Sequence, residues 1–383
     1  MDNSATTALC DAAKQAMLAA MECYGNPSSL HKAGLDAEHM VKKAREQVLS
    51  ALGVRGGAGQ VYFTSSGTEA NNLAILGSAY AKERRAGGRI VTTEGEHSSV
   101  EMVLRDLEKK GFDVVRIPTR DGVLDMDFAS KAITKDTLLV TTMMVNNETG
   151  ALYDLKSLFA LAKKNAPGVV THCDAVQGFM KTIFSPAAIG ADMVTVSSHK
   201  IHGPKGVGAL YVSAEVLKAK KLIPVTLGGG QESGMRSGTE NTIGIAGFGA
   251  ACAKAQSSLR DDLRQMSALR TYFEGKLAEI GEITLNLPRA GRAPHIVNLT
   301  LPDIKSETML HYLSGQGIYV SSGSACSSHG HATSRALSAF GLSAEKADCS
   351  LRVSLCPANT EQEIDALCAA LGTGVRELVR IHK

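Results

Sequence analysis

The feature that most constrains the fold is the alternation of short apolar runs with helical patterns over most of the first 250 residues. The runs have the length and β-branched content of strands, and they span residues 60–64, 89–93, 114–118, 138–145, 169–173, 193–197 and 207–212. Strands separated by helices pack mainly in parallel, with helices on both faces of the sheet. The sequence therefore predicts an α/β fold with a large, mainly parallel sheet.

The pattern changes near residue 250, where residues 246–272 have the periodicity of one long helix. Strand candidates follow at 296–301 and 317–321. A capping-box pattern at 360–363 predicts a final helix.

A chain of 383 residues is longer than one hydrophobic core usually supports, so we expect two domains. The change of pattern predicts a large domain over residues 12–250. A smaller C-terminal α/β domain would comprise residues 1–11 and 251–383. Because no repeat or Pro-rich linker separates the two, we expect them to pack closely.

Charge and cysteine usage disfavour several classes of protein. Basic and acidic residues nearly balance at 41 and 38, without a polybasic block, so we expect no direct contact with nucleic acid or membrane. The eight cysteines are dispersed and form no C-x-x-C pair, which indicates reduced thiols. The start of the chain lacks the features of a signal peptide, and no apolar run is long enough to cross a bilayer. We therefore expect a cytoplasmic protein.

The stretch SSGTEANNLAI, residues 65–75, follows a predicted strand and contains a capping box at Ser66 to Glu69. A strand, a turn of small residues and a helix N-terminus can hold a phosphate, because free N–H groups and the positive end of the helix dipole meet there. A plainly capped helix explains the same residues and is, for this segment alone, the more common case.

Two charged residues follow predicted strands. Asp174, with Gln177 three residues later, is either a turn former or a carboxylate that faces a protonated ring nitrogen. Lys200 lies between two histidines, and a desolvated lysine exposes the nucleophilic amine that Schiff-base chemistry requires. The alternative is a solvated loop lysine, which Lys205 fits better.

Cys326 lies in SSGSACSS, residues 321–328, where nothing bulky shields it, so we expect a thiol that other groups can reach. Its spacing to His329 and His331 could suit a metal, but a fourth ligand is missing nearby, and we predict no metal site. Arg352 lies in a strand-like run, where a buried charge needs an anionic partner.

Together these motifs resemble those of the cysteine desulfurases, pyridoxal-phosphate enzymes of fold type I in the class-V aminotransferase group. The resemblance covers nearly the whole chain, in the family's order, through DNSATT, GNPSSLHKAG, SSGTEANNLAI, EHSSV, VNNETG, DAVQ, SSHKIHGPKGVGALYV, GGGQESGMRSGTEN, SSGSACSS and LRVSL. The 26-residue separations from Asp174 to Lys200 (200 − 174) and from Cys326 to Arg352 (352 − 326) are also similar. One departure is Ser4, where relatives commonly have alanine.

The resemblance implies how pyridoxal 5'-phosphate would be bound. Lys200 would hold it covalently and move the substrate Cα proton, while Asp174 would pair with the ring nitrogen. Gln177 would bond the ring hydroxyl, His97 would stack on the ring, and Asn147 would lie near ring and substrate. The phosphate would be held by Gly67, Thr68, Ser197 and His199, and by Thr239 from a second copy of the chain, which implies a homodimer.

The resemblance also implies the reaction. Arg352 would bind the carboxylate of L-cysteine, and the Cys326 thiolate would take the sulfur as a persulfide and leave L-alanine. An iron–sulfur scaffold, a tRNA-thiolation enzyme or another carrier would then accept the sulfur.

Three alternatives stay open. A sister enzyme acting on selenocysteine or cysteine sulfinate would depend less on Cys326, because those substrates release selenium or sulfite more easily. A pyridoxal-phosphate aminotransferase has no use for a reachable thiol. A catalytically silent binding partner with the same fold is disfavoured by the intact set of Lys200, Asp174, Cys326 and Arg352.

Overall fold

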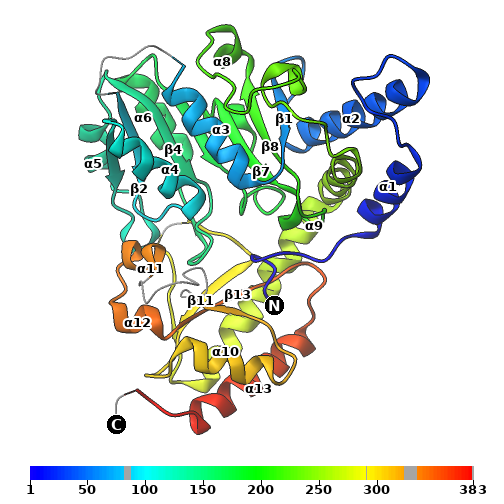
Figure 1. Cartoon of the computed structure of the whole chain (residues 1–383). Coiled ribbons are helices and arrows are strands. Elements are labelled where there is room, and N and C mark those ends of the chain that lie inside the picture. Colours follow the sequence, from blue (N-terminus) through cyan, green and yellow to red (C-terminus); the bar gives the residue numbers. More distant parts are fainter. Residues whose placement is uncertain (82–87, 290, 323–333, 382–383) are drawn as a thin grey trace.

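The computed structural model describes residues 1–81, 88–289, 291–322 and 334–381, and a seven-stranded sheet forms the centre of its larger part (Figure 1). The strands are β1 (Gly59–Thr64), β2 (Arg89–Thr93), β3 (Asp113–Ile117), β4 (Thr137–Met143), β6 (Val170–Asp174), β7 (Met193–Ser197) and β8 (Gly208–Ser213). Their order is β1-β8-β7-β6-β4-β2-β3; β8 is antiparallel to both neighbours and the other pairs are parallel. The seven predicted strands and the mainly parallel sheet are confirmed.

Alternate strand residues face opposite sides of this sheet, and each side packs against its own helices. Tyr62 and Leu139 belong to the core beneath α3 (Gly67–Ala79) and α4 (Ser98–Lys109). Phe63 and Val140 belong to the core on the other side, beneath α2 (Lys32–Ala51), α5 (Met126–Ala132), α6 (Leu155–Asn165) and the start of α9 (Thr242–Ile280). The sheet is therefore buried on both faces, as parallel sheets require.

A smaller antiparallel sheet lies beside the large one, in the lower half of Figure 1. Its strands lie in the order β12 (Ser321–Ser322), β13 (Ser350–Ser354), β11 (Ile296–Thr300) and β9 (Thr284–Leu285). The helices α10 (Ser306–Ser314) and α13 (Glu361–Glu377) pack with the second half of α9 around a third core. The predicted capping box is confirmed at the start of α13, where Thr360 is the N-cap.

The strand predicted at 317–321 is wrong in extent, because only Ser321 and Ser322 pair with β13. The preceding residues end α10 instead: Gly317 has φ +76°, and the Ile318 N–H donates to the Leu313 carbonyl. This turn directs Tyr319 into solvent, with 64% of its surface exposed.

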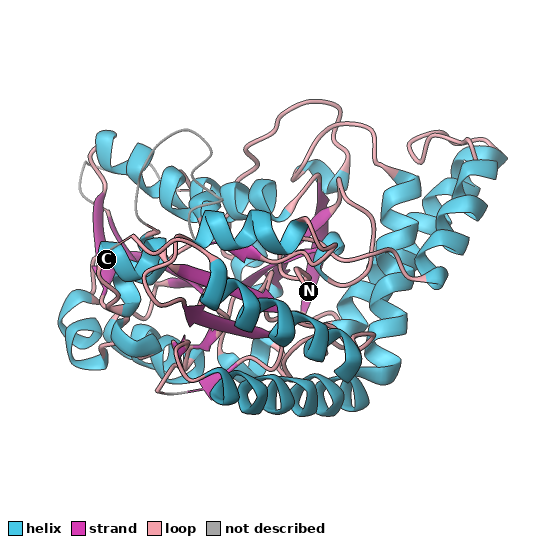
Figure 2. Ribbon diagram, turned by 90° about the horizontal axis from the view of Figure 1, so that it is seen from below, coloured by secondary structure: helices cyan, strands magenta, loops and turns pink. Residues whose placement is uncertain are grey.

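One helix, α9 (Thr242–Ile280), runs through residue 250 and links both sheets, and it is longer at both ends than the predicted 246–272. The N-terminal residues also lie between the sheets, since Asp2 forms a β-bridge with Ser354 of β13. Figures 1 and 2 both show the N-terminus near the middle of the molecule.

The shorter elements connect these layers. They are α1 (Asp11–Glu22), α7 (Pro186–Ile189), α8 (Ala214–Lys218), α11 (Arg335–Phe340), α12 (Ala344–Asp348), β5 (Ala151–Leu152), β10 (Gly291–Arg292), η1 (Arg120–Gly122), η2 (Ser198–Lys200) and η3 (Glu232–Gly234). Among the helices that can be described, none has the length and apolar character needed to cross a membrane.

Candidate active site

A cavity of about 470 Å³ lies where the carboxyl ends of the parallel strands face the small sheet. This edge is where open α/β sheets bind their ligands, because the connecting loops diverge there. Ten of the residues selected from the sequence line the cavity: Gly67, Thr68, His97, Asn147, Asp174, Gln177, Ser197, His199, Lys200 and Arg352. Residues separated by up to 285 positions (352 − 67) thus meet in one space.

Two selected residues are not among them. Thr239 is exposed on the loop before α9 and does not line the cavity. Cys326 lies outside the described residues together with His329 and His331, so its role stays a prediction. Within the ranges that the structure describes, no group of three or more His, Cys, Asp or Glu side chains could hold a metal ion.

The helix α3 begins at the cavity wall with Ser66 as its N-cap, and only half of the predicted capping box is present, because the Glu69 carboxylate accepts from the Ser65 N–H instead of the Ser66 N–H. The Glu69 N–H donates to Ser66 Oγ at 3.1 Å. The first N–H groups of a helix have no partner within the helix, and Gly67 and Thr68, which begin α3, line the cavity. A Cβ atom on Gly208 would lie 2.4 Å from the carbonyl carbon of Ser66, so β8 approaches the helix start as closely as only glycine allows. The capped helix start thus lies at the cavity wall, where the sequence predicted a phosphate site.

Asp174 ends β6 with its side chain buried, at 6% exposure. Its Oδ2 accepts a hydrogen bond from Asn71 Nδ2 at 2.8 Å, and its Oδ1 accepts one from the Val176 N–H at 3.0 Å. These two donors fix the orientation of the carboxylate. Sequence reasoning did not select Asn71, although it belongs to the stretch SSGTEANNLAI.

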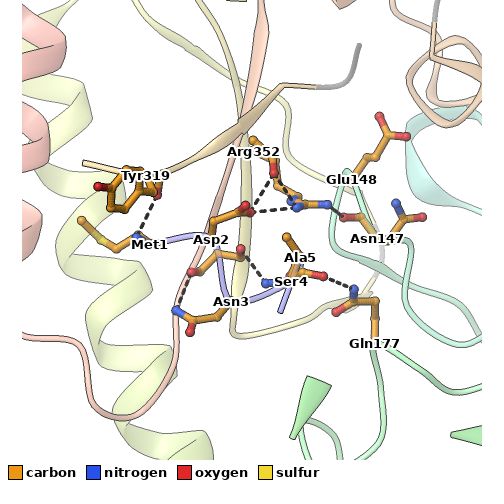
Figure 3. Close-up of polar contacts among 12 residues, drawn as sticks. Met1, Asp2, Asn3, Ser4, Ala5, Asn147, Glu148, Gln177, Tyr319 and Arg352 are labelled. Carbon is orange, nitrogen blue, oxygen red and sulfur yellow. Dashed lines mark hydrogen bonds and ion pairs between the residues drawn. The ribbon is translucent and has the colours of Figure 1, made fainter. Parts of the chain in front are cut away.

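Lys200 projects from the short turn after β7, and its amine is held by the first residues of the chain. Lys200 Nζ donates to the carbonyl oxygens of Ser4 at 2.5 Å and Ala5 at 2.8 Å. Gln177 Nε2 donates to the same Ser4 carbonyl at 2.9 Å (Figure 3). Lys200 is half-buried in the cavity wall, so the interpretation as a plain solvated loop lysine does not hold.

The two histidines of the cavity favour their neutral forms. Burial lowers the pKa of His97, whose Nδ1 accepts the Ser99 N–H at 3.1 Å at the start of α4. Burial, reinforced by the charge of Lys200, lowers the pKa of His199 to about 4. Neutral rings beside Lys200 avoid a cluster of like charges.

Arg352 reaches the cavity from β13 and is only 7% exposed. Its Nη2 donates to Asp2 Oδ1 and Ser321 Oγ, both at 2.9 Å, and its Nη1 donates to the Asn147 carbonyl at 2.9 Å (Figure 3). Asp2 is thus the anionic partner that the sequence required without identifying it. The only signal for it was its place in the stretch DNSATT.

Glu148 is another cavity residue that sequence reasoning did not select. Burial raises the pKa of its carboxyl group, and Ser334 Oγ donates to its Oε2 at 2.6 Å. The cavity wall therefore combines an amine, a guanidinium, a buried aspartate and a helix N-terminus.

A mainly parallel sheet with an aspartate and a lysine at its carboxyl edge is typical of pyridoxal-phosphate enzymes of fold type I. The family model described as aminotransferase class-V matches residues 1–367, and the chain belongs to this family. Its members depend on pyridoxal phosphate.

Within the family, the relatives are cysteine desulfurases. Cysteine desulfurase IscS of Clostridium botulinum is 39% identical over 376 residues, which cover 97% of this chain and 92% of that protein. The solved structure of a NifS-like protein has a TM-score of 0.90 at 34% identity and covers 98% of this chain and 99% of its own. A structure titled SspA in complex with cysteine has a TM-score of 0.77 at 30% identity, covering 94% of this chain and 99% of its own. The chain is a member of the cysteine desulfurase group.

Proposed function

We propose that the protein converts L-cysteine to L-alanine and retains the sulfur as a persulfide on Cys326. The observation that carries the proposal is one cavity that brings together the Lys200 amine, the Asp174 carboxylate and the Arg352 guanidinium. They come from the turn after β7, the end of β6 and the middle of β13, respectively. The structure titled as a complex with cysteine, a relative at 30% identity, supports the choice of substrate.

The residues of the cavity fit pyridoxal 5'-phosphate. The anion cradle at Gly67 and Thr68 suits its phosphate, with Ser197 and His199 beside it, and Asp174 suits a protonated ring nitrogen. The buried Oε1 of Gln177 has no hydrogen-bond partner among the described residues, so it is available to the ring hydroxyl. When bound, the group supplies an electron sink for the charge that develops at the substrate Cα.

The protein's own groups then have defined tasks. Lys200 Nζ binds the cofactor and moves the Cα proton, while the Ser4 and Ala5 carbonyls orient it. Arg352 binds the substrate carboxylate. His97, whose pKa burial lowers, would contact the ring, and Asn147 would contact ring and substrate.

The sulfur transfer balances without an outside oxidant. The Cys326 thiolate attacks the substrate sulfur, the carbon–sulfur bond breaks and a sulfur–sulfur bond forms. The carbon fragment takes up a proton and leaves as alanine, so carbon is reduced as sulfur is oxidised to the persulfide level. A sulfur-acceptor protein, such as an iron–sulfur scaffold or a tRNA-thiolation enzyme in the cytoplasm, would then remove the terminal sulfur.

A homodimer belongs to the same proposal. Several large apolar side chains around α1 are solvent-exposed, including Tyr24 at 89% and Leu30 at 93%, which is typical of a surface that a partner covers. Thr239 is also exposed, as a residue serving the phosphate site of a second copy would be.

The test is incubation of the purified, cofactor-loaded protein with L-cysteine and a reductant, with sulfide and alanine measured together. We expect equal yields, an absorption band in the visible, and loss of both activity and band in Lys200→Ala. Lys205→Ala, a neighbouring surface lysine, is the matched control and should keep both. Sulfide or alanine formed alone, or an active Lys200→Ala protein, would contradict the proposal.

A Cys326 variant distinguishes a cysteine desulfurase from a sister enzyme that acts on selenocysteine or cysteine sulfinate. Cys326→Ser should release almost no sulfide from cysteine if the thiol accepts sulfur, whereas a selenocysteine- or sulfinate-specific enzyme would keep most of its activity on its own substrate. Unchanged turnover of cysteine by Cys326→Ser would remove the persulfide step.

A further inference from the structure

The guanidinium of Arg352 is already engaged by a carboxylate of the same chain. Nη2 donates to Asp2 Oδ1 and to Ser321 Oγ, and Ser321 Oγ in turn donates to the same Asp2 Oδ1 at 2.8 Å. These three groups form a closed triangle of hydrogen bonds at one nitrogen. Nε, by contrast, has no hydrogen-bond partner among the described residues.

The choice of nitrogen matters for ligand binding. A carboxylate binds a guanidinium with two parallel hydrogen bonds along one of two edges, Nε with Nη2 or Nη1 with Nη2. Both edges contain Nη2, the nitrogen that Asp2 and Ser321 occupy. A ligand carboxylate must therefore share Nη2 with Asp2 or displace it before it can bind in the two-bond geometry.

Asp2 is held in this place by the strand that carries Arg352. It forms a β-bridge with Ser354, two residues after Arg352. The next residue fixes it further, because Asn3 N and Nδ2 both donate to the Ser354 carbonyl, at 3.2 and 3.0 Å. The carboxylate is thus a built part of the cavity wall rather than a chance contact of a loose terminus (Figure 3).

The pair is moderately strong. The Arg352 side chain is 9% exposed and that of Asp2 is 25% exposed, so solvent reaches the acidic partner and weakens the attraction. The other carboxyl group near Arg352, that of Glu148, accepts a hydrogen bond from Ser334. Because solvent already weakens the Asp2–Arg352 pair, a ligand carboxylate can compete with Asp2 for the guanidinium.

We propose that Asp2 is an internal competitor that sets how strongly Arg352 selects ligands bearing a carboxylate. The inference rests on the proposed role of Arg352 and adds the residue that tunes it. Its consequence is moderate affinity for the amino-acid product, because the freed guanidinium regains Asp2 when alanine leaves. A variant with a neutral residue of the same shape in place of Asp2 should bind amino acids more tightly.

The experiment compares two ligands that differ only in the carboxylate. Dissociation constants of L-alanine and L-alaninamide are measured by calorimetry on the cofactor-loaded protein, and their ratio, alaninamide over alanine, reports the preference for a carboxylate. In Asp2→Asn we expect the ratio to rise by about two- to fivefold, the scale of one partly exposed ion pair. Asp2→Glu restores the charge and should return the ratio toward the wild-type value.

Controls make the result specific. Asp11→Asn is the matched control, since the Asp11 side chain is 86% exposed and should leave the ratio unchanged. Melting curves establish that each variant is folded. A ratio that stays constant or falls in Asp2→Asn overturns the inference, because Asp2 would then only position Arg352 or be irrelevant to it. If the wild-type protein forms no alanine from cysteine while Asp2→Asn still raises the ratio, the proposed reaction is overturned and the role of Asp2 stands.

Discussion

Several residues beside the cavity have buried polar side-chain atoms that find no hydrogen-bond partner among the described residues. They are Lys181 Nζ, both ring nitrogens of His295, and Ser4 Oγ. Burial lowers the pKa of Lys181 to about 7, and the positive charge of Lys200 adds to the effect. Burial also lowers the pKa of His295 well below its usual range. Of these groups, Lys181 has a pKa near neutral pH, so its cost to stability should depend on pH.

Lys181→Met should stabilise the protein near neutral pH. The unfolded chain holds the lysine proton up to its ordinary pKa of 10.5, whereas the folded protein releases it near pH 7. The cost of the buried ammonium is thus complete below pH 7 and disappears as the pH rises toward 10.5. We expect a gain in the free energy of unfolding on the order of 3 kcal/mol at pH 7.

Urea unfolding at pH 6, 8 and 10 would measure this gain and its decline. The matched control is Lys135→Met, at an exposed lysine, which should show no such pH dependence. A gain for Lys181→Met that stays the same at all three pH values would show that the lysine is not deprotonated by burial.

The candidate catalytic and cofactor-binding residues were easier to predict from the sequence than the residues that form hydrogen bonds with them. Asp174 and Lys200 could be selected because a charged residue directly after a buried strand has few structural reasons to be there. Asn71 and Asp2 could not, because their roles depend on contacts 103 and 350 residues away. Only folding brings such pairs together.

Among the elements, the junction of β8 and α3 is the one whose geometry the site most depends on. Gly208 permits the close approach, since an added Cβ would lie 2.4 Å from the Ser66 carbonyl carbon and 2.7 Å from the Gly67 nitrogen. Both atoms are backbone, so relief requires the helix start to move. The anion cradle would move with it.

Gly208→Ala should therefore release pyridoxal phosphate more readily and destabilise the protein by about 1–3 kcal/mol. Retention of the cofactor after dialysis, followed by its absorbance, and the melting temperature measure the two effects. Gly168→Ala is the control, because a Cβ there meets no atom within 4 Å. Full retention in Gly208→Ala would show that the cradle is not where the phosphate binds.

The sequence predicted elements well where local signals and packing agree. The capping box at Thr360 marked the start of α13, because it satisfies the free N–H groups of that helix directly. The end of α9 was underestimated, because its last turns are stabilised by burial of Phe273 and Leu277 in the third core. The prediction of a strand at 317–321 was wrong in extent, because a turn at Gly317 redirects the chain there.

At the scale of the whole molecule, the small sheet has its own core, formed by residues from 269 to 375. We therefore keep the division into a large domain of residues 12–250 and a small domain of 1–11 and 251–383 as a proposal. The exposed apolar side chains near α1, among them Leu18 and Tyr24, belong to the large domain. A homodimer would cover them.

Charge placed in this patch should separate the subunits. For the double variant Tyr24→Asp and Leu30→Asp, sedimentation velocity should report a shift from dimer to monomer, and activity should fall as Thr239 loses its partner site. Val379→Asp, at a residue that is 81% exposed on the C-terminal segment, is the control and should leave the dimer intact. A double variant that still sediments as a dimer would assign the interface to another surface.

The contact that holds the Lys200 amine uses main-chain carbonyl groups of Ser4 and Ala5, not their side chains. Substitution at these two positions leaves the carbonyls in place as long as the path of the backbone is kept. Exchange of Ser4 for alanine would therefore leave the reactive nitrogen with the same two acceptors.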